Sequence, residues 1–264
     1  MTERNRRIAV SMISGDDWRK EEIKRLLESL EPHCHALYVN WNGTKRKPRW
    51  GAWTSMPIHY MQSKWEDDFA ATRNDAYRMI PKKDFGWWLW VDTDDILVAP
   101  EGFAPILDDI DPYTRGVFMR YAYAIEPNTG HCVVEQWRER LMSTDWLWMW
   151  KWPIHEICLA PQGTQFTRAD GELGQKVYIE HLRKSGEDRG ARDRNRRIIM
   201  KAYRQYPNEP RYAYYFANEC LAEAENSEPG PRKVQFCDSA IVAYQKFLGM
   251  KMVQNDDTYG ASVR

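Results

Sequence analysis

The feature that most constrains the fold of this chain is an apolar run, residues 86–91, that ends in a cluster of carboxylates. The run reads GWWLWV, which indicates a short buried strand. Asp92, Asp94 and Asp95 follow it directly. Because ligands of open α/β sheets bind outside the carboxyl ends of the strands, these aspartates are the first place to expect a functional site.

The residues before this run predict a βαβ unit. Residues 7–13 are a short apolar segment rich in strand formers, and residues 14–17 are typical of a turn. A helix with an aspartate N-cap is expected next, because apolar residues recur at helical spacing from Trp18 to Leu30. A second apolar segment, residues 35–40, ends in the turn residues 40–43, so the two strands should lie parallel.

The middle of the chain predicts further elements. Residues 44–56 are basic and loop-like, and a helix from Phe69 to Ile80 follows an acidic start. A helix around 102–110 precedes residues 117–125, whose alternation predicts the first strand of an antiparallel hairpin. Four tryptophans then alternate in a predicted strand that ends at Pro153: Trp146, Trp148, Trp150 and Trp152. We favour core packing for these indoles, and a sugar-stacking surface is the alternative.

The C-terminal part of the chain is helical in its pattern. From about residue 187 three helices are expected, with breaks at Pro207 and around residues 229–231. The last two resemble the paired helices of a tetratricopeptide unit, which cannot bury its apolar face alone. The 264 residues therefore divide into an α/β domain at 1–186 and a helical extension at 187–264.

Composition excludes several classes of protein. Lys plus Arg and Asp plus Glu both number 38, so a zero formal charge argues against a nucleic-acid or membrane-surface protein governed by electrostatics. No segment has a signal-peptide pattern or the length of a membrane span. The five cysteines form no C-x-x-C pair, which fits neither a zinc ribbon nor a disulfide framework. We expect a cytoplasmic protein.

Residues around the acidic cluster share order and spacing with one enzyme family: Trp65, Asp68, Phe69, Arg73, Asn74, Trp90, Asp92, Asp94 and Asp95. The segments Arg140-Leu141-Met142, 152–156 (WPIHE) and 177–181 (VYIEH) continue the match. Together they resemble family 2 glycosyltransferases, in the subgroup with tetratricopeptide helices after the catalytic domain. The resemblance implies a GT-A fold, which is a Rossmann-like mixed α/β sheet, with a small C-terminal helical appendage.

The resemblance also implies a metal-dependent, inverting transfer of a sugar from a nucleoside diphosphate to a hydroxyl. Asp94 would be a direct ligand of Mn²⁺ or Mg²⁺, because hard cations take carboxylate oxygens. Asp92 would reach the metal or the ribose. His181 would be a third metal ligand or a diphosphate contact, and His155 is the alternative for that place.

The substrates have candidate residues of their own. Ser11, Asn42 and Arg73, together with Asp92, are expected to bind the nucleotide sugar, and a UDP-sugar is favoured. Residues 40–44 stand where the family has an Asp-x-Gly-Ser run that helps to read the base, so the base itself stays unassigned. Glu156 is the candidate general base. A surface glutamate without a catalytic role is the alternative for that residue.

Other functions and acceptors stay open at this point. A haloacid-dehalogenase-like phosphatase would use Asp92 as nucleophile, and a non-catalytic adaptor would bind peptides through the helical extension. We favour a glycan or a protein hydroxyl as the acceptor. Modified DNA remains an alternative, because positive charge gathers in residues 45–49 and in the helix at 189–204.

Overall fold

The computed structural model describes residues 3–108, 110–126, 129–182 and 189–250. It divides into two compact units. Among the described residues, the first unit contains the strands and helices α1 to α5, and the second contains α6 to α8 with Pro153–His155. The predicted boundary between residues 186 and 187 lies outside the described residues and stays a prediction.

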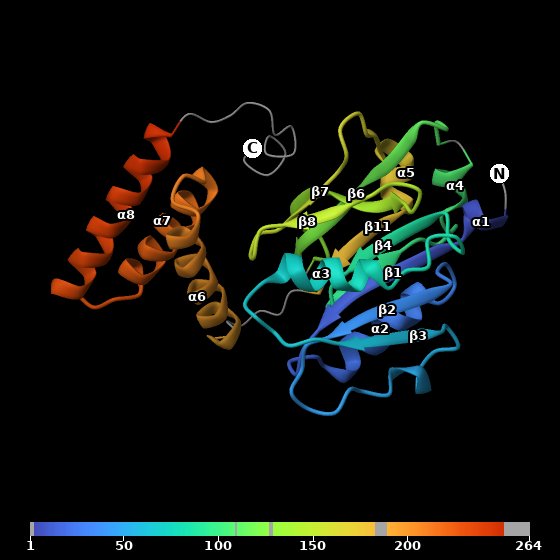
Figure 1. Cartoon of the computed structure of the whole chain (residues 1–264), viewed down its shortest axis with the longest axis horizontal. Helices are drawn as coiled ribbons and strands as arrows, with labels where there is room; N and C mark the ends of the chain where they lie inside the picture. The colour runs from blue at the N-terminus through green and yellow to red at the C-terminus, as the bar shows by residue number, and fades with distance from the viewer. Residues whose placement is uncertain (1–2, 109, 127–128, 183–188, 251–264) are drawn as a thin grey trace. The chain divides into compact units, whose positions relative to one another are not determined.

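The elements of the first unit are labelled in Figure 1. Its strands are β1 (Ile8–Ser14), β2 (Ala36–Trp41), β3 (Ile58–Gln62), β4 (Trp87–Val91), β5 (Asp95–Val98), β6 (Thr114–Ile125), β7 (Cys132–Ser143), β8 (Met149–Lys151), β9 (Ile157–Leu159), β10 (Gln165–Arg168) and β11 (Tyr178–His181). Its helices are α1 (Glu3–Arg6), α2 (Lys20–Leu30), α3 (Phe69–Arg78), α4 (Ala104–Leu107) and α5 (Gly171–Lys176), with a 3-10 turn at Trp50–Ala52.

The core of this unit is a nine-stranded mixed sheet in the order β3-β2-β1-β4-β7-β6-β11-β5, with β10 beside β6. β1 is parallel to both β2 and β4, whereas β7 is antiparallel to β4 and to β6. The predicted βαβ unit, the buried strand before Asp92 and the antiparallel hairpin are confirmed, and so is the mixed α/β class. The carboxyl ends of β1, β2 and β4 lie at one edge, where such sheets bind ligands.

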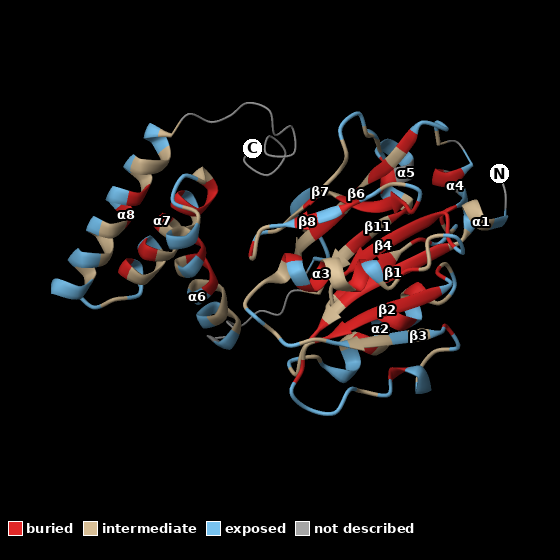
Figure 2. Cartoon of the chain, in the orientation of Figure 1, coloured by how far each residue is buried: buried red, intermediate tan, exposed pale blue. Residues whose placement is uncertain are grey.

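Both faces of the sheet are covered, which explains why its central strands are apolar without alternation. On one face, residues such as Leu26 of α2 pack against Val10 and its neighbours. On the other face, Ala70 and Tyr77 of α3 join a cluster with Trp88. In Figure 2, β1, β2 and β4 are buried along their length. A one-residue slip would exchange the side chains that pack on the two faces, so the separate packing of each face, rather than burial alone, fixes the register.

Two predictions at the amino-terminal end are corrected. No aspartate caps α2: its N-cap is Arg19, which makes no side-chain cap bond. Asp16 instead accepts hydrogen bonds from Thr44 and Lys45, in the loop after β2. The edge strand β3 was not predicted, because its residues are mixed in polarity and only partly buried.

The predicted tryptophan strand is also corrected. Only Met149–Lys151 is a strand, because a turn precedes it and Trp152 has a positive φ of 82°. Trp148 and Trp150 are buried. The Trp150 ring packs edge-on against Trp90, with centroids 5.0 Å apart. Core packing is therefore the role of these two indoles.

The second unit contains α6 (Arg189–Gln205), α7 (Pro210–Glu225) and α8 (Pro231–Gly249). α7 and α8 each have proline in the first turn, where its missing N–H leaves no bond unmade. The three predicted helices are therefore present, and their tetratricopeptide character stays a prediction. Within the described ranges, no helix is long and apolar enough to cross a membrane.

Candidate active site

The N-terminal part of α3 places the first site residue. Asp68 caps this helix, since its carboxylate accepts a hydrogen bond from the Ala71 N–H at 2.8 Å. This cap fixes where the helix begins, and Arg73 follows in its second turn. Asn74 then accepts from the Trp150 N–H and donates to the Trp150 carbonyl, each at 2.8 Å. The pair of bonds ties β8 to α3 next to the site.

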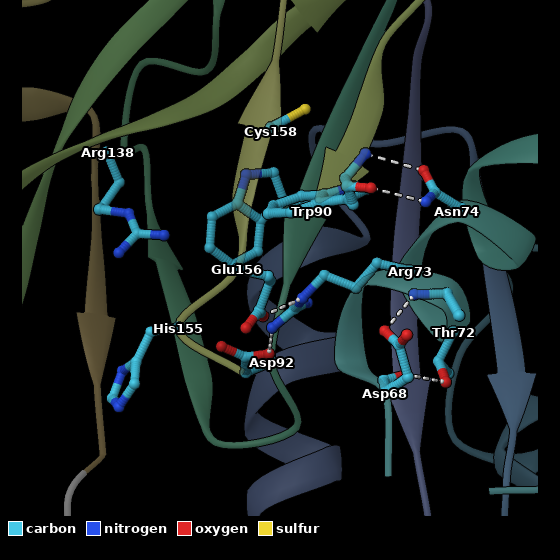
Figure 3. Close-up of polar contacts among 12 residues, drawn as sticks. Asp68, Thr72, Arg73, Asn74, Trp90, Asp92, Arg138, His155, Glu156 and Cys158 are labelled. Atoms are coloured by element: carbon cyan, nitrogen blue, oxygen red, sulfur yellow. Dashed lines mark hydrogen bonds and ion pairs between the residues drawn. The ribbon is translucent and has the colours of Figure 1, made fainter. Parts of the chain in front are cut away.

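Arg73 joins two carboxylates from distant parts of the chain. Its Nη2 lies 2.7 Å from Asp92 Oδ1, and its Nε lies 2.6 Å from Glu156 Oε1. Figure 3 shows the guanidinium between these two acids. The guanidinium carbon also lies 4.7 Å from the Trp90 ring centroid and 5.2 Å from that of Trp150. Arg73 is therefore oriented by two ion pairs and two aromatic rings.

This pairing decides the charge of Asp92. Burial alone would raise the pKa of Asp92, but the charges of Arg73 and Arg140 outweigh burial and lower the pKa to about 2. Asp92 is therefore an anion at neutral pH.

A second group of side chains lies beyond the end of β4. One ligand atom each from Asp94, Asp95 and His181 lies within 4.8 Å of the others. The antiparallel pairing of β5 with β11 explains the contact, because it places His181 opposite Asp95. His181 Nδ1 is 3.3 Å from Asp95 Oδ1 and 3.7 Å from Asp94 Oδ1.

Burial separates the two aspartates of this group. Asp95 is fully buried beside Arg140, whereas 35% of the Asp94 side chain is exposed. Burial, opposed by the charge of His181 and assisted by Asp92 and Asp95, raises the pKa of Asp94 to about 6. A carboxyl group with a raised pKa is one whose anion gains from a nearby cation.

The donor set fits a divalent metal ion. Asp94 contributes an accessible carboxylate oxygen, and His181 contributes an imidazole nitrogen. Carboxylates suit both Mn²⁺ and Mg²⁺, while an imidazole ligand is better suited to the transition metal. The group is thus chemically compatible with a divalent cation.

The structure brings together most of the predicted site residues: Arg73, Asp92, Asp94, Glu156 and His181. The acidic and histidine group differs in one member from the predicted metal ligands. It contains Asp95, which was not predicted as a ligand, whereas Asp92 lies beside it with Oδ1 paired to Arg73, and contact of Asp92 with the metal or the ribose stays a prediction. His155 is not in the group, and its ring stacks on Tyr215 of α7 with centroids 3.9 Å apart.

The structure gives less support to Ser11 and Asn42, the two other residues expected to bind the nucleotide sugar. Ser11 lies within β1, three residues before its end, and is only 4% exposed, so it is not at the ligand-binding edge. Asn42 does lie just beyond the end of β2. Its side chain donates to Ser63 Oγ at 2.7 Å, and this bond ties the segment after β2 to the segment after β3.

The sequence analysis matched the segment with Arg140 to the family but gave Arg140 no role, and it did not identify Tyr121 as a site residue. Arg140 Nη1 lies 3.1 Å from Asp95 Oδ2, and the Tyr121 hydroxyl donates to Asp95 Oδ1 at 3.0 Å. Arg140 reaches this position through a bulge: Val117 pairs with Leu141 and Phe118 with Glu139, so Arg140 has no partner in β6. A bulge that re-aims one side chain leaves no local pattern in the sequence.

Neither a protein-family model nor a curated protein matches this sequence. Among solved structures, TarS from S. aureus is similar at a TM-score of 0.45 and 12% identity, over 90% of this chain and 49% of that one. This chain thus spans about half of that TarS chain. TarS 1–349 in complex with UDP-GlcNAc matches at 0.45 and 11%, over 91% and 81% of the two chains. The glycosyltransferase GlyE from Streptococcus pneumoniae TIGR4 matches at 0.31 and 13%, over 53% and 34%.

Proposed function

We propose that this protein is a metal-dependent, inverting glycosyltransferase that uses a UDP-sugar. The observation that carries the proposal is the position of Arg73, whose guanidinium holds Asp92 on one side and Glu156 on the other. Asp92 adjoins the group formed with Asp94 and His181, where a metal and the diphosphate would lie. One cation thus joins the donor half of the site to the candidate base.

The chemistry assigned to Glu156 is removal of a proton from the acceptor. Its Oε1 is held by Arg73 at 2.6 Å, and Oε2 is not part of that ion pair. The acceptor oxygen forms a bond to the anomeric carbon while the bond from that carbon to the diphosphate breaks. The acceptor proton passes to Glu156 Oε2, and the electron pair of the broken bond leaves with UDP. A single displacement of this kind inverts the anomeric centre.

The donor half of the site has to stabilise the leaving diphosphate. When bound, Mn²⁺ or Mg²⁺ would neutralise the charge that develops on it. Asp94 and His181 would hold the metal ion. Asp92 is oriented by Arg73 and is free to contact the ribose or the metal through Oδ2, since the ion pair uses Oδ1.

For the acceptor we propose a neutral glycan or a protein hydroxyl. Glu156 is 13% exposed, and the guanidinium beside it is already paired with two carboxylates, Asp92 and Glu156, so it offers little positive charge to an anionic acceptor. Modified DNA remains the alternative acceptor.

The decisive experiment measures UDP-sugar hydrolysis and transfer with Mn²⁺ and with EDTA. We expect turnover with Mn²⁺ and its loss in EDTA or in Asp94→Asn, because the carboxylates around this site would repel an uncompensated diphosphate. Asp145→Asn is the matched control, since Asp145 is an exposed carboxylate paired with Arg4. Full turnover in EDTA, or an active Asp94→Asn variant, contradicts the metal assignment.

A further inference from the structure

We infer that Asp95 is a positioning residue, which orients His181 and the backbone of Asp92 and does not itself bind the metal. The inference deepens the proposed function and rests on it, because the proposed function supplies the metal. On this inference Asp94 and His181 are the two residues of the group that would bind the metal. Asp95 is the third, and it holds His181 in place.

The first support is that the Asp95 carboxylate is already saturated. Its Oδ2 accepts from the Asp92 N–H at 2.9 Å and from Arg140 Nη1 at 3.1 Å. Its Oδ1 accepts from the Tyr121 hydroxyl at 3.0 Å and lies 3.3 Å from His181 Nδ1. A carboxylate offers about four lone-pair sites. Four partners therefore leave none for a metal ion.

Burial gives the second support. Asp95 and Arg140 have no exposed side-chain surface. The guanidinium of Arg140 fills the space next to the carboxylate, with its carbon 3.6 Å from the Trp90 centroid and 4.3 Å from that of Tyr121. A metal ion with its water ligands has no path to Asp95 that leaves this packing intact, whereas Asp94 is 35% exposed.

The third support is the orientation of His181. Its ring is stacked parallel to that of Tyr123, with centroids 5.2 Å apart and an angle of 4° between the planes. With the ring fixed and Nδ1 closer to Asp95 Oδ1, at 3.3 Å, than to Asp94 Oδ1, at 3.7 Å, we assign the Nδ1 proton to the hydrogen bond with Asp95. Nε2 is then the nitrogen with a free lone pair. Carboxylates that orient a histidine in this way also make it a better metal ligand.

The tautomer of His181 tests the inference without any metal. In ¹⁵N-histidine-labelled protein treated with EDTA, at a pH where the ring is neutral, long-range ¹H–¹⁵N spectra identify the protonated nitrogen. Signals of His181 are assigned by their absence in His181→Gln. We expect the proton on Nδ1. A proton on Nε2 would overturn the inference.

A substitution that loosens Asp95 gives a second test. Tyr121→Phe removes one donor from Asp95 and keeps the ion pair with Arg140. A positioning residue that loses a restraint holds His181 less firmly, so Mn²⁺ binding should weaken. Loss of a residue that hydrogen-bonds to a metal ligand lowers metal affinity by about 10–100-fold. We expect a loss of about tenfold in Tyr121→Phe, because Tyr121 acts on His181 only through Asp95.

The readout is the Kd of Mn²⁺ in the presence of UDP, measured from the electron paramagnetic resonance signal of free Mn²⁺. Tyr178→Phe is the control, since its hydroxyl donates to Glu180 on the strand that contains His181. We expect its Kd to equal that of the wild type. An unchanged or lower Kd in Tyr121→Phe overturns the inference. If the wild type binds no Mn²⁺, the metal in the proposed function fails, and the tautomer of His181 still decides the role of Asp95.

Discussion

Two arginine–carboxylate clusters contact the same indole and differ in how completely they are closed. Arg140 and Arg73 place their guanidinium carbons 3.6 and 4.7 Å from the Trp90 centroid. The closed cluster, Arg140 with Asp95, has no exposed side-chain surface. The open cluster, Arg73 with Asp92 and Glu156, keeps 31% of Asp92 and 13% of Glu156 exposed.

The difference in exposure determines whether each cluster can bind a ligand. A buried ion pair has lost its hydration, and hydrogen bonds offset part of that cost, as they do at both oxygens of Asp95. Nε and Nη2 of Arg140 have no hydrogen-bond partner among the described residues, and the guanidinium packs against the rings of Trp90 and Tyr121. Such a pair fixes shape and has no capacity left to bind a ligand. In the open cluster each acid has one oxygen outside the ion pair with Arg73, so both can contact a substrate. At this edge of the sheet, a fully buried carboxylate therefore has a structural role, and a partly exposed one can take part in the reaction.

Breaking the closed cluster should have the largest effect on folding. Arg140→Met leaves a charged carboxylate in the interior, and removal of one partner of a buried pair costs about 3–5 kcal/mol. The free energy of unfolding in urea measures this. Arg120→Met is the control, because Arg120 pairs with Glu135 at 2.6 Å near the surface, where such a pair contributes at most about 1 kcal/mol. Equal losses in the two variants would contradict the assignment of the closed cluster.

A substitution in the open cluster should instead lower the rate of sugar transfer. Glu156→Gln keeps the size of the side chain and removes the base, so transfer should fall by about 10²–10⁴. Binding of the donor, measured by calorimetry, should be nearly unchanged. The control is Glu135→Gln, which alters a carboxylate paired with arginine away from the site. If transfer in Glu156→Gln stays within a few fold of the wild type, the base is another group.

A third carboxylate sharpens the comparison, because both of its oxygens accept hydrogen bonds although it is only partly buried. Asp16 accepts from the Thr44 hydroxyl at 2.7 Å and from the Thr44 and Lys45 N–H groups at 2.8 and 3.1 Å. The hydrogen bond from the Thr44 side chain, followed by that from its backbone, lowers the pKa of Asp16. A group whose pKa is lower in the folded state stabilises the fold above its unfolded pKa, and this contribution is lost as the pH falls below that value.

The smallest effect is therefore expected for Asp16→Asn. Its Tm should be slightly below that of the wild type at neutral pH, and the two values should converge in acid, where the wild-type carboxyl is protonated. Asp17→Asn, the neighbouring substitution, controls for the change in net charge. A difference in Tm that persists unchanged into acid would show that the hydrogen-bonded anion is not its cause.

Local sequence patterns were enough to predict the position of part of the site. The start of α3 follows from Asp68 and the helical spacing after it, and this places Arg73. The strand before Asp92 follows from its apolar run. Arg140 could not be predicted in the same way, because its direction depends on a bulge set by pairing with β6. The tryptophan alternation failed for a related reason: the backbone turns before Met149, so alternation in the sequence did not correspond to one strand.

The bonds from three residues of α3 to the segment around β8 have a consequence for how the protein folds. Arg73 reaches Glu156, Asn74 reaches Trp150 and Tyr77 reaches the Trp146 carbonyl, across sequence separations of 83, 76 and 69 residues. Closing loops of this length costs entropy before any contact returns it, so such contacts form late on the folding path. The parallel unit of β1, β2 and α2 needs only nearby residues. By this argument the unit of β1, α2 and β2 forms before the site, whereas the pairings of β1 with β4 and of β5 with β11 span sequence separations as long as those of the site.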